Sequence, residues 1–145
     1  MPNPLIAQGS LNKLRASITW SQFPALNVTA SYLSKEGIRL VLQGESVLYM
    51  PTMTGAVTSQ EPYMMIECTL NLLKSQPLAN LYKQQMETNA LLADGTIRPD
   101  AVPLSPYQVT NASIKSIREL DFSGEHAVFA VTIGGYYLIN SSLFN

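Results

Sequence analysis

The sequence predicts a mainly β domain with one packed α-helix. Several segments alternate apolar and polar residues, which is typical of strands with one buried face. A single segment carries the apolar stripe of an amphipathic helix. The chain has 145 residues and shows no internal repeat, low-complexity tract or linker, so it fits one domain over residues 1–145.

Strand signals fill the first third of the chain. Apolar residues alternate over 14–20, from Leu14 to Trp20, and again over 26–32, so each segment predicts a strand. Residues 34–37 read as a turn in which Gly37 takes a positive φ. A third strand is expected over 38–50, with a bulge or bend at Gly44.

The middle of the chain combines a loop, a strand and the helix. Residues 51–62 show no period and predict a long loop, and connections of that length are often functional. Residues 63–73 alternate strictly and predict a fourth strand. A helix is expected to begin near the N-cap Ser75, with Pro77 in its first turn, and to end before the turn signal Asp94-Gly95.

The last third predicts a proline-rich loop and a hairpin. Pro99, Pro103 and Pro106 exclude a central strand or a helix interior from that stretch. Strands over 107–120 and 127–139, joined around SGEH, are expected to pair antiparallel. The pair Gly134-Gly135 interrupts the second strand, which indicates a bulge or the close approach of another backbone.

The strand over 127–139 has apolar residues on both faces, which is unusual for an exposed strand of a lone domain. Charged residues make up 13% of the chain, against about 25% in ordinary soluble proteins. Both observations favour a subunit that hides part of its surface against neighbours. The alternating residues on the two faces are Ala127, Phe129, Val131, Ile133, Tyr137 and Ile139 on one side, and Val128, Ala130, Tyr136 and Leu138 on the other.

Catalytic and cofactor-binding residues are sparse. His126 is the only histidine and falls in a turn, and Cys68 is the only cysteine and lies in an apolar run that predicts a buried, inert thiol. No phosphate-binding or nucleophile motif occurs, so we expect no enzyme, no cofactor and no metal site. The net charge of −1 and scattered basic residues argue against tight nucleic-acid binding. We also expect no export signal and no membrane insertion.

Three strands are expected to carry short, weakly charged polar side chains on one face. Such a face can be an ordinary solvated surface, or a lining past which a polyanion slides without sticking. Composition alone leaves both interpretations open. The residues concerned are Asn27, Thr29 and Ser31, then Arg39 and Gln43, then Glu67, Thr69 and Asn71.

Taken nearly end to end, the chain resembles the tail tube proteins of contractile-tailed bacteriophages. The likeness lies in the order and texture of four segments: MPNPLIAQGSLNKLRASITW, FPALNVTASYLSKEGIRLVLQGESVLYMPTMTGAVTSQEPYMM, PLANLYKQQMETN and FAVTIGGYYLINSSLF. The resemblance implies a two-sheet β-sandwich or barrel with one flanking α-helix, six copies to a ring and rings stacked into a tube. Inner strands would join neighbours into a continuous barrel, as in the type VI secretion tube, which shares this architecture.

The resemblance also implies a role and partners. The chain would be a structural virion protein, assembled in the bacterial host cytoplasm, that forms the tube through which phage DNA is ejected. Its partners would be further copies of itself, the tail sheath protein, the baseplate and the tail terminator. DNA would pass through the lumen without specific binding.

Two groups of residues are expected to act in such a tube. Arg39 would retard DNA unless Glu45 or Glu67 neutralises it or its strand faces elsewhere. Candidates for the lumen are Asn27, Thr29, Ser31, Arg39, Gln43, Glu45, Glu67, Thr69 and Asn71. Candidates for contacts between subunits or rings are Pro51, Thr52, Met53, Thr54, Gly55, Ala56, Val57, Thr58, Ser59, Tyr136, Tyr137, Leu143 and Phe144.

Two other functions compete with the tube. A baseplate or tube-end protein of the same fold would close a ring without polymerising further. A β-barrel that binds a small molecule could use Trp20, Tyr136 and Tyr137 as a pocket, although aromatic residues in strands belong more often to the core.

Overall fold

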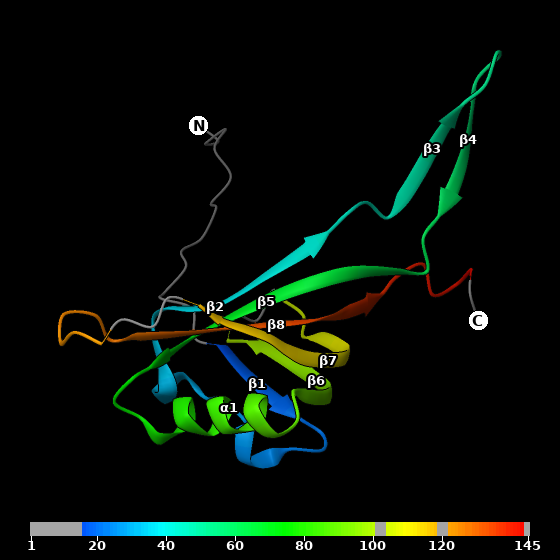
Figure 1. Ribbon diagram of the computed structural model, residues 1–145. Coiled ribbons are helices and arrows are strands. Elements are labelled where there is room, and N and C mark those ends of the chain that lie inside the picture. The colour runs from blue at the N-terminus through cyan, green and yellow to red at the C-terminus, as the bar shows by residue number, and fades with distance from the viewer. Residues whose placement is uncertain (1–15, 101–103, 119–121, 144–145) are drawn as a thin grey trace, which may run out of the picture.

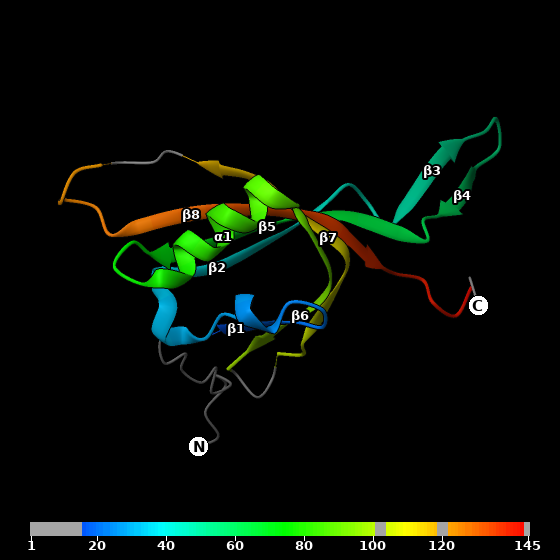
Figure 2. The same cartoon turned by 60° about the horizontal axis from the view of Figure 1, so that its bottom comes forward.

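The computed structural model describes residues 16–100, 104–118 and 122–143, and it shows a mainly β protein with one α-helix. Six strands form one antiparallel sheet in the order β1-β6-β7-β8-β5-β2, which curls into a half-barrel (Figures 1 and 2). A separate hairpin, β3–β4, extends away from this sheet. The strands are β1 (Ala16–Trp20), β2 (Leu33–Gln43), β3 (Val47–Pro51), β4 (Ala56–Gln60), β5 (Tyr63–Leu73), β6 (Leu91–Pro99), β7 (Tyr107–Arg118) and β8 (Val128–Leu138), and the helix is α1 (Pro77–Thr88).

The hydrophobic core fills the inside of the curled sheet. Strand β5 shows how the sequence specifies it, because every second residue from Ile66 to Leu72 is buried while the residues between them are partly exposed. Cys68 pairs with Ile133 of β8, so both strands contribute the same face. The buried residues are Ile18, Trp20, Leu26, Val28, Ile66, Cys68, Leu70, Leu72, Leu78, Ala79, Tyr82, Leu92, Ile97, Val109, Ala112, Ile114, Val131 and Ile133.

Helix α1 is fastened to the sheet through buried hydrogen bonds. The indole Nε1 of Trp20 donates to the Tyr82 hydroxyl at 2.9 Å, and that hydroxyl donates to the Leu26 carbonyl at 2.6 Å. Burial of Tyr82 raises the pKa of its hydroxyl, so the proton that it donates is retained. These hydrogen bonds connect β1, helix α1 and the turn after β1 that contains Leu26.

The curl of the sheet has local causes in β6, β7 and β8. The pairings β6–β7 and β7–β8 both contain register shifts, and bulges of this kind bend a sheet. Gly95 packs directly beneath Trp20, where an added Cβ would come within 2.4 Å of the indole ring. At Gly135 an added Cβ would lie 3.1 Å from the Thr110 carbonyl, which confirms the predicted close backbone approach at the glycine pair.

Several sequence predictions are confirmed. The strand over 63–73 has the bounds of β5, and the antiparallel hairpin at the end of the chain is formed by β7 and β8. The strand over 14–20 is present from Ala16, while Leu14 lies outside the described residues. Residues 119–120 at the end of the predicted strand 107–120 also lie outside them.

Other predictions for the first half are wrong. Residues 26–32 form no strand; two 3-10 turns, η1 (Pro24–Leu26) and η2 (Ala30–Tyr32), flank a single bridge between Val28 and Ile18. Residues 34–37 lie within β2, where Gly37 takes its positive φ of 68° in an irregular stretch of the pairing with β5. The bend predicted at Gly44 is confirmed, with a φ of 86°, but the strand over 38–50 does not continue through it, and its second part becomes β3.

The second half and the layer arrangement also need correction. The segment 51–62 contains a strand, β4, and not only a loop. The predicted helix is present, with Gln76 and not Ser75 at its N-cap, and it ends at Thr88. Residues 91–99 form β6, so Asp94-Gly95 lies inside a strand and not in a turn. Pro99 closes β6, and Pro103 lies outside the described residues. The two-sheet sandwich is replaced by one curled sheet, since the second sheet is the protruding hairpin.

Candidate assembly surface

The hairpin β3–β4 exposes apolar side chains on both of its faces. Its strands pair only with each other among the described strands, and it stands clear of the half-barrel in both views (Figures 1 and 2). Paired residues share a face, which puts Leu48, Met50 and Val57 on one side and Tyr49 and Pro51 on the other. Residues 47–60 contain no Asp, Glu, Lys, Arg or His. Neither face therefore resembles a normal solvated surface.

Asn140 fixes the base of the hairpin. Its side-chain amide donates to the Glu61 carbonyl at 2.7 Å and to the Ser46 carbonyl at 3.3 Å, so it bridges the two backbone segments that enter and leave the hairpin. The Glu61 amide adds a bond to the Ser46 carbonyl at 2.9 Å. Asn140 has a φ of 51°, a left-handed conformation that asparagine tolerates better than most residues. The direction of the hairpin is thus set by the end of β8.

Exposed apolar residues continue from the hairpin onto the sheet. The end of β2, the start of β5 and the end of β8 run together toward the hairpin, and Leu138 is 60% exposed. The rings of Tyr63 and Tyr136 meet in a tilted arrangement across β5 and β8, with their centroids 5.6 Å apart. We call the hairpin and these strand ends the apolar arm; its exposed large apolar residues are Val41, Leu42, Leu48, Tyr49, Met50, Met53, Val57, Tyr63, Met65 and Leu138.

The contact residues predicted from the sequence fall largely on this arm. Residues 51–59 are all exposed, and Met53 in the hairpin turn is fully so. Tyr136 and Tyr137 point to opposite faces of β8, and Tyr137 packs against the core and lies 5.6 Å from the Tyr107 ring. Leu143 is exposed near the base of the arm, while Phe144 lies outside the described residues.

Five of the predicted lumen residues share one face of β2 and β5. Arg39 pairs with Thr69, and Gln43 reaches across to Glu67 with its amide 3.2 Å from the carboxylate. Asn71 donates to the Gly37 carbonyl at 3.0 Å. The face continues onto β8 and β7, because Thr69 pairs with Thr132, and Thr132 with Ser116, although Thr132 itself is only 1% exposed. It lies opposite the core and is called the polar face below.

The other predicted lumen residues lie elsewhere. Asn27 accepts a hydrogen bond from the Trp20 amide at 2.8 Å and thereby shapes the turn after β1. Thr29 and Ser31 bond to each other at 2.9 Å beside a 3-10 turn, off the sheet. Glu45 is exposed in the bend between β2 and β3. The alternation over 26–32 misled the prediction because Leu26 and Val28 are both buried without belonging to a strand.

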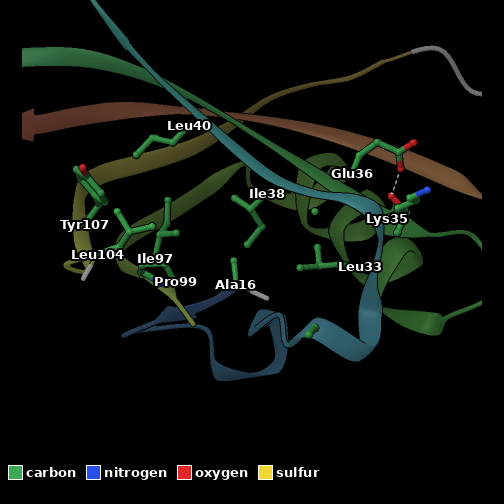
Figure 3. A pocket seen from close by; sticks show the side chains of 13 residues that line it. Ala16, Leu33, Lys35, Glu36, Ile38, Leu40, Ile97, Pro99, Leu104 and Tyr107 are labelled. Atoms are coloured by element: carbon green, nitrogen blue, oxygen red, sulfur yellow. Dashed lines mark hydrogen bonds between the residues drawn. The ribbon is translucent and has the colours of Figure 1, made fainter. Parts of the chain in front are cut away.

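The half-barrel leaves an apolar cavity between its two edge strands, which the sequence did not reveal. The cavity has a volume of about 340 Å³ and lies between β2 on one side and β1 and β6 on the other (Figure 3). Its lining includes the apolar Leu33, Ile38, Leu40, Ile97, Leu104 and Tyr107, with the charged Lys35 and Glu36 at one end (Figure 3). We call it the seam.

The aromatic pocket considered from the sequence does not form. Trp20 is buried in the core, and Tyr136 and Tyr137 lie on opposite faces of β8, so the three do not share a pocket. None of them lines the seam.

The reactive side chains Cys68 and His126 lie in ordinary structural positions. Cys68 is 1% exposed, and burial raises the pKa of its thiol to about 12. His126 is exposed in the turn before β8. Over residues 16–100, 104–118 and 122–143, no cluster of His, Cys, Asp and Glu side chains is arranged to hold a metal ion, and no helix in these ranges is long and apolar enough to cross a membrane.

The comparisons with known proteins leave the chain without assigned relatives: no protein-family model matches it, and no curated protein matches it.

Proposed function

We propose that this protein is the tail tube subunit of a contractile-tailed bacteriophage, which polymerises as stacked rings, with six copies to a ring, around a lumen that conducts DNA. The observation that carries the proposal is the apolar arm. A surface of this size without ionised groups on its hairpin marks a site of protein contact in an otherwise soluble chain.

The hairpin in particular needs a partner. An isolated two-stranded hairpin is marginally stable in water, because it has too few neighbours to bury its side chains. Here Leu48 and Tyr49 point to opposite faces, so packing against a single surface would leave one of them exposed. A position between neighbouring copies covers both faces, as stacking of rings requires.

The polar face supports the second half of the proposal, a lumen for DNA. It carries Arg39, Glu67 and Lys115 among uncharged Thr, Asn and Gln side chains, with the exposed apolar Val41 and Met65 beside them and Lys115 lying over Gly134 of β8. Tight binding of DNA needs clustered cations that displace many counterions. Isolated cations separated by neutral groups and a carboxylate bind a passing strand weakly, which suits transport.

Electron microscopy of the purified chain tests the proposal. We expect negatively stained samples at tens of micromolar to show tubes built from stacked rings. A variant in which a short Gly-Ser linker replaces residues 47–60 is the control, and it should stay unassembled while its circular dichroism retains the β signal. A chain that remains a monomer under these conditions refutes the proposal.

A single closed ring would instead favour a baseplate or tube-end protein of the same fold. In either role the chain would act in the virion, after assembly in the host cytoplasm, beside the tail sheath, baseplate and tail terminator proteins.

A further inference from the structure

Over residues 16–100, 104–118 and 122–143, no segment of the chain fills the seam, which makes it a candidate acceptor site. Strands β1 and β2 end the sheet order and face each other across the cavity without pairing (Figure 3). Among the described residues β2 pairs only with β5, so its outer edge presents backbone N–H and C=O groups that no strand satisfies. Apolar lining and an open strand edge together suit a β-strand with apolar side chains.

The hairpin β3–β4 has the matching properties. It also has open edges, since each of its strands pairs on one side only. One face presents Leu48, Met50 and Val57, which could enter the cavity without carrying an ionised group into it. Burying an unpaired charge in such a site would cost several kcal/mol, and this hairpin avoids that cost.

Geometry excludes an intramolecular match. The seam lies in the body of the half-barrel, whereas the hairpin projects from the far end of β2 (Figures 1 and 2). A cavity of about 340 Å³ is at the small end of ligand pockets, so it would hold a few side chains and not a whole hairpin. The fit requires side chains inserted from a hairpin that lies along the edge of β2.

We infer that the hairpin of one copy docks along the edge of β2 in a second copy and inserts the side chains of its Leu48 face into the seam. Donor and acceptor are different surfaces, so the contact is head-to-tail and leaves each copy able to donate and accept again. The inference rests on the proposed function, because it names the contact by which the subunits assemble.

Disulfide trapping between two singly substituted chains tests this contact. Cys68 is buried and need not be removed. Thr54→Cys places a thiol in the hairpin turn, and Lys35→Cys places one at the rim of the seam. The two variants are mixed before assembly and oxidised mildly, and dimers are counted on a non-reducing gel. Gln84→Cys, on the exposed side of α1, replaces Lys35→Cys in the control mixture.

We expect a covalent dimer only in the mixture of Thr54→Cys with Lys35→Cys, in at least tenfold excess over the control mixture and over either variant alone. A dimer from Thr54→Cys alone would indicate hairpins that meet each other and would overturn the inference. Tubes without the mixed disulfide would also overturn it while leaving the proposed function intact. Absence of assembly in micrographs of the unsubstituted chain would refute both.

Discussion

Replacing Leu48 by Ser should weaken assembly by an amount that follows from its exposure. Leu48 is 52% exposed in the single chain, so about half of its burial remains to be gained on contact. Full burial of a leucine is worth about 1.5–3 kcal/mol, which leaves about 1 kcal/mol for the contact. Since 1.4 kcal/mol corresponds to a factor of ten in affinity, each contact should weaken about fivefold.

The critical concentration for assembly measures this loss. Tubes are pelleted from a series of protein concentrations, and the plateau of protein left in the supernatant should rise about fivefold for Leu48→Ser. Leu81→Ser is the matched control, because Leu81 is 39% exposed on α1, away from the arm. The free energy of unfolding should change by less than about 0.5 kcal/mol in the arm variant. Equal plateaus for the two variants, or no shift in either, would refute the reasoning.

Three further predictions concern the fold that holds the arm. Tyr82→Phe leaves the Trp20 indole N–H without its buried acceptor, so the free energy of unfolding in urea should fall by about 2 kcal/mol; a loss below about 0.5 kcal/mol would contradict the buried bond. Burial raises the pKa of Cys68 from 9.0 to about 12, so the folded thiol keeps its proton where the unfolded one ionises, and stability should fall between pH 9 and 12. Cys68→Ala should reduce that fall in stability. The same dependence of stability on pH in both proteins would contradict the role given to Cys68. Asn140→Gly keeps the left-handed φ but removes the side-chain amide that bridges the base of the hairpin. Hydrogen exchange at the Glu61 backbone amide should therefore speed up at least tenfold, with little change in melting temperature. Unchanged exchange would show that the Asn140 side chain does not hold the base of the hairpin.

The sequence predicts the elements whose alternation reports burial against a single core. Strand β5 is the clearest case, since its even residues from Ile66 to Leu72 face the core and its odd residues do not. Strand β6 was missed because an irregularity at Ala93 interrupts its alternation of apolar and polar residues. Ala93 has a φ of 60°, and the pairing with β7 shifts register on both sides of it. Asp94-Gly95 therefore reads as a turn although it lies in a strand.

The hairpin could not be predicted from alternation for a different reason. Neither of its faces is buried in the single chain, so no pattern separates an inside from an outside. From the sequence, residues 51–62 read only as a loop and residues 47–50 as the end of the strand over 38–50, so the hairpin was not recognised. The seam depends on residues as distant as Ile38 and Ile97, whose proximity follows from the curl of the sheet and not from any local pattern.

Three asparagines that match the acceptor pattern Asn-x-Ser/Thr turn out to have structural roles. The Asn27 side chain accepts from the Trp20 backbone amide, and the Asn140 side chain donates to the Glu61 carbonyl. The backbone amide of Asn111, whose φ is 52°, donates to the Asp94 carboxylate at 3.1 Å. Nothing in the spacing of these matches predicts the contacts that the three residues make.

The uncharged hairpin has a consequence for how a tube made from this chain responds to its surroundings. The side chains of residues 47–60 form no ion pairs, so charge screening at high ionic strength should not weaken the contacts that they make. Their strength would come from water released by apolar groups, a driving force that fades on cooling. Such a polymer would weaken on cooling but persist at high salt concentration, the reverse of one built on electrostatic contacts.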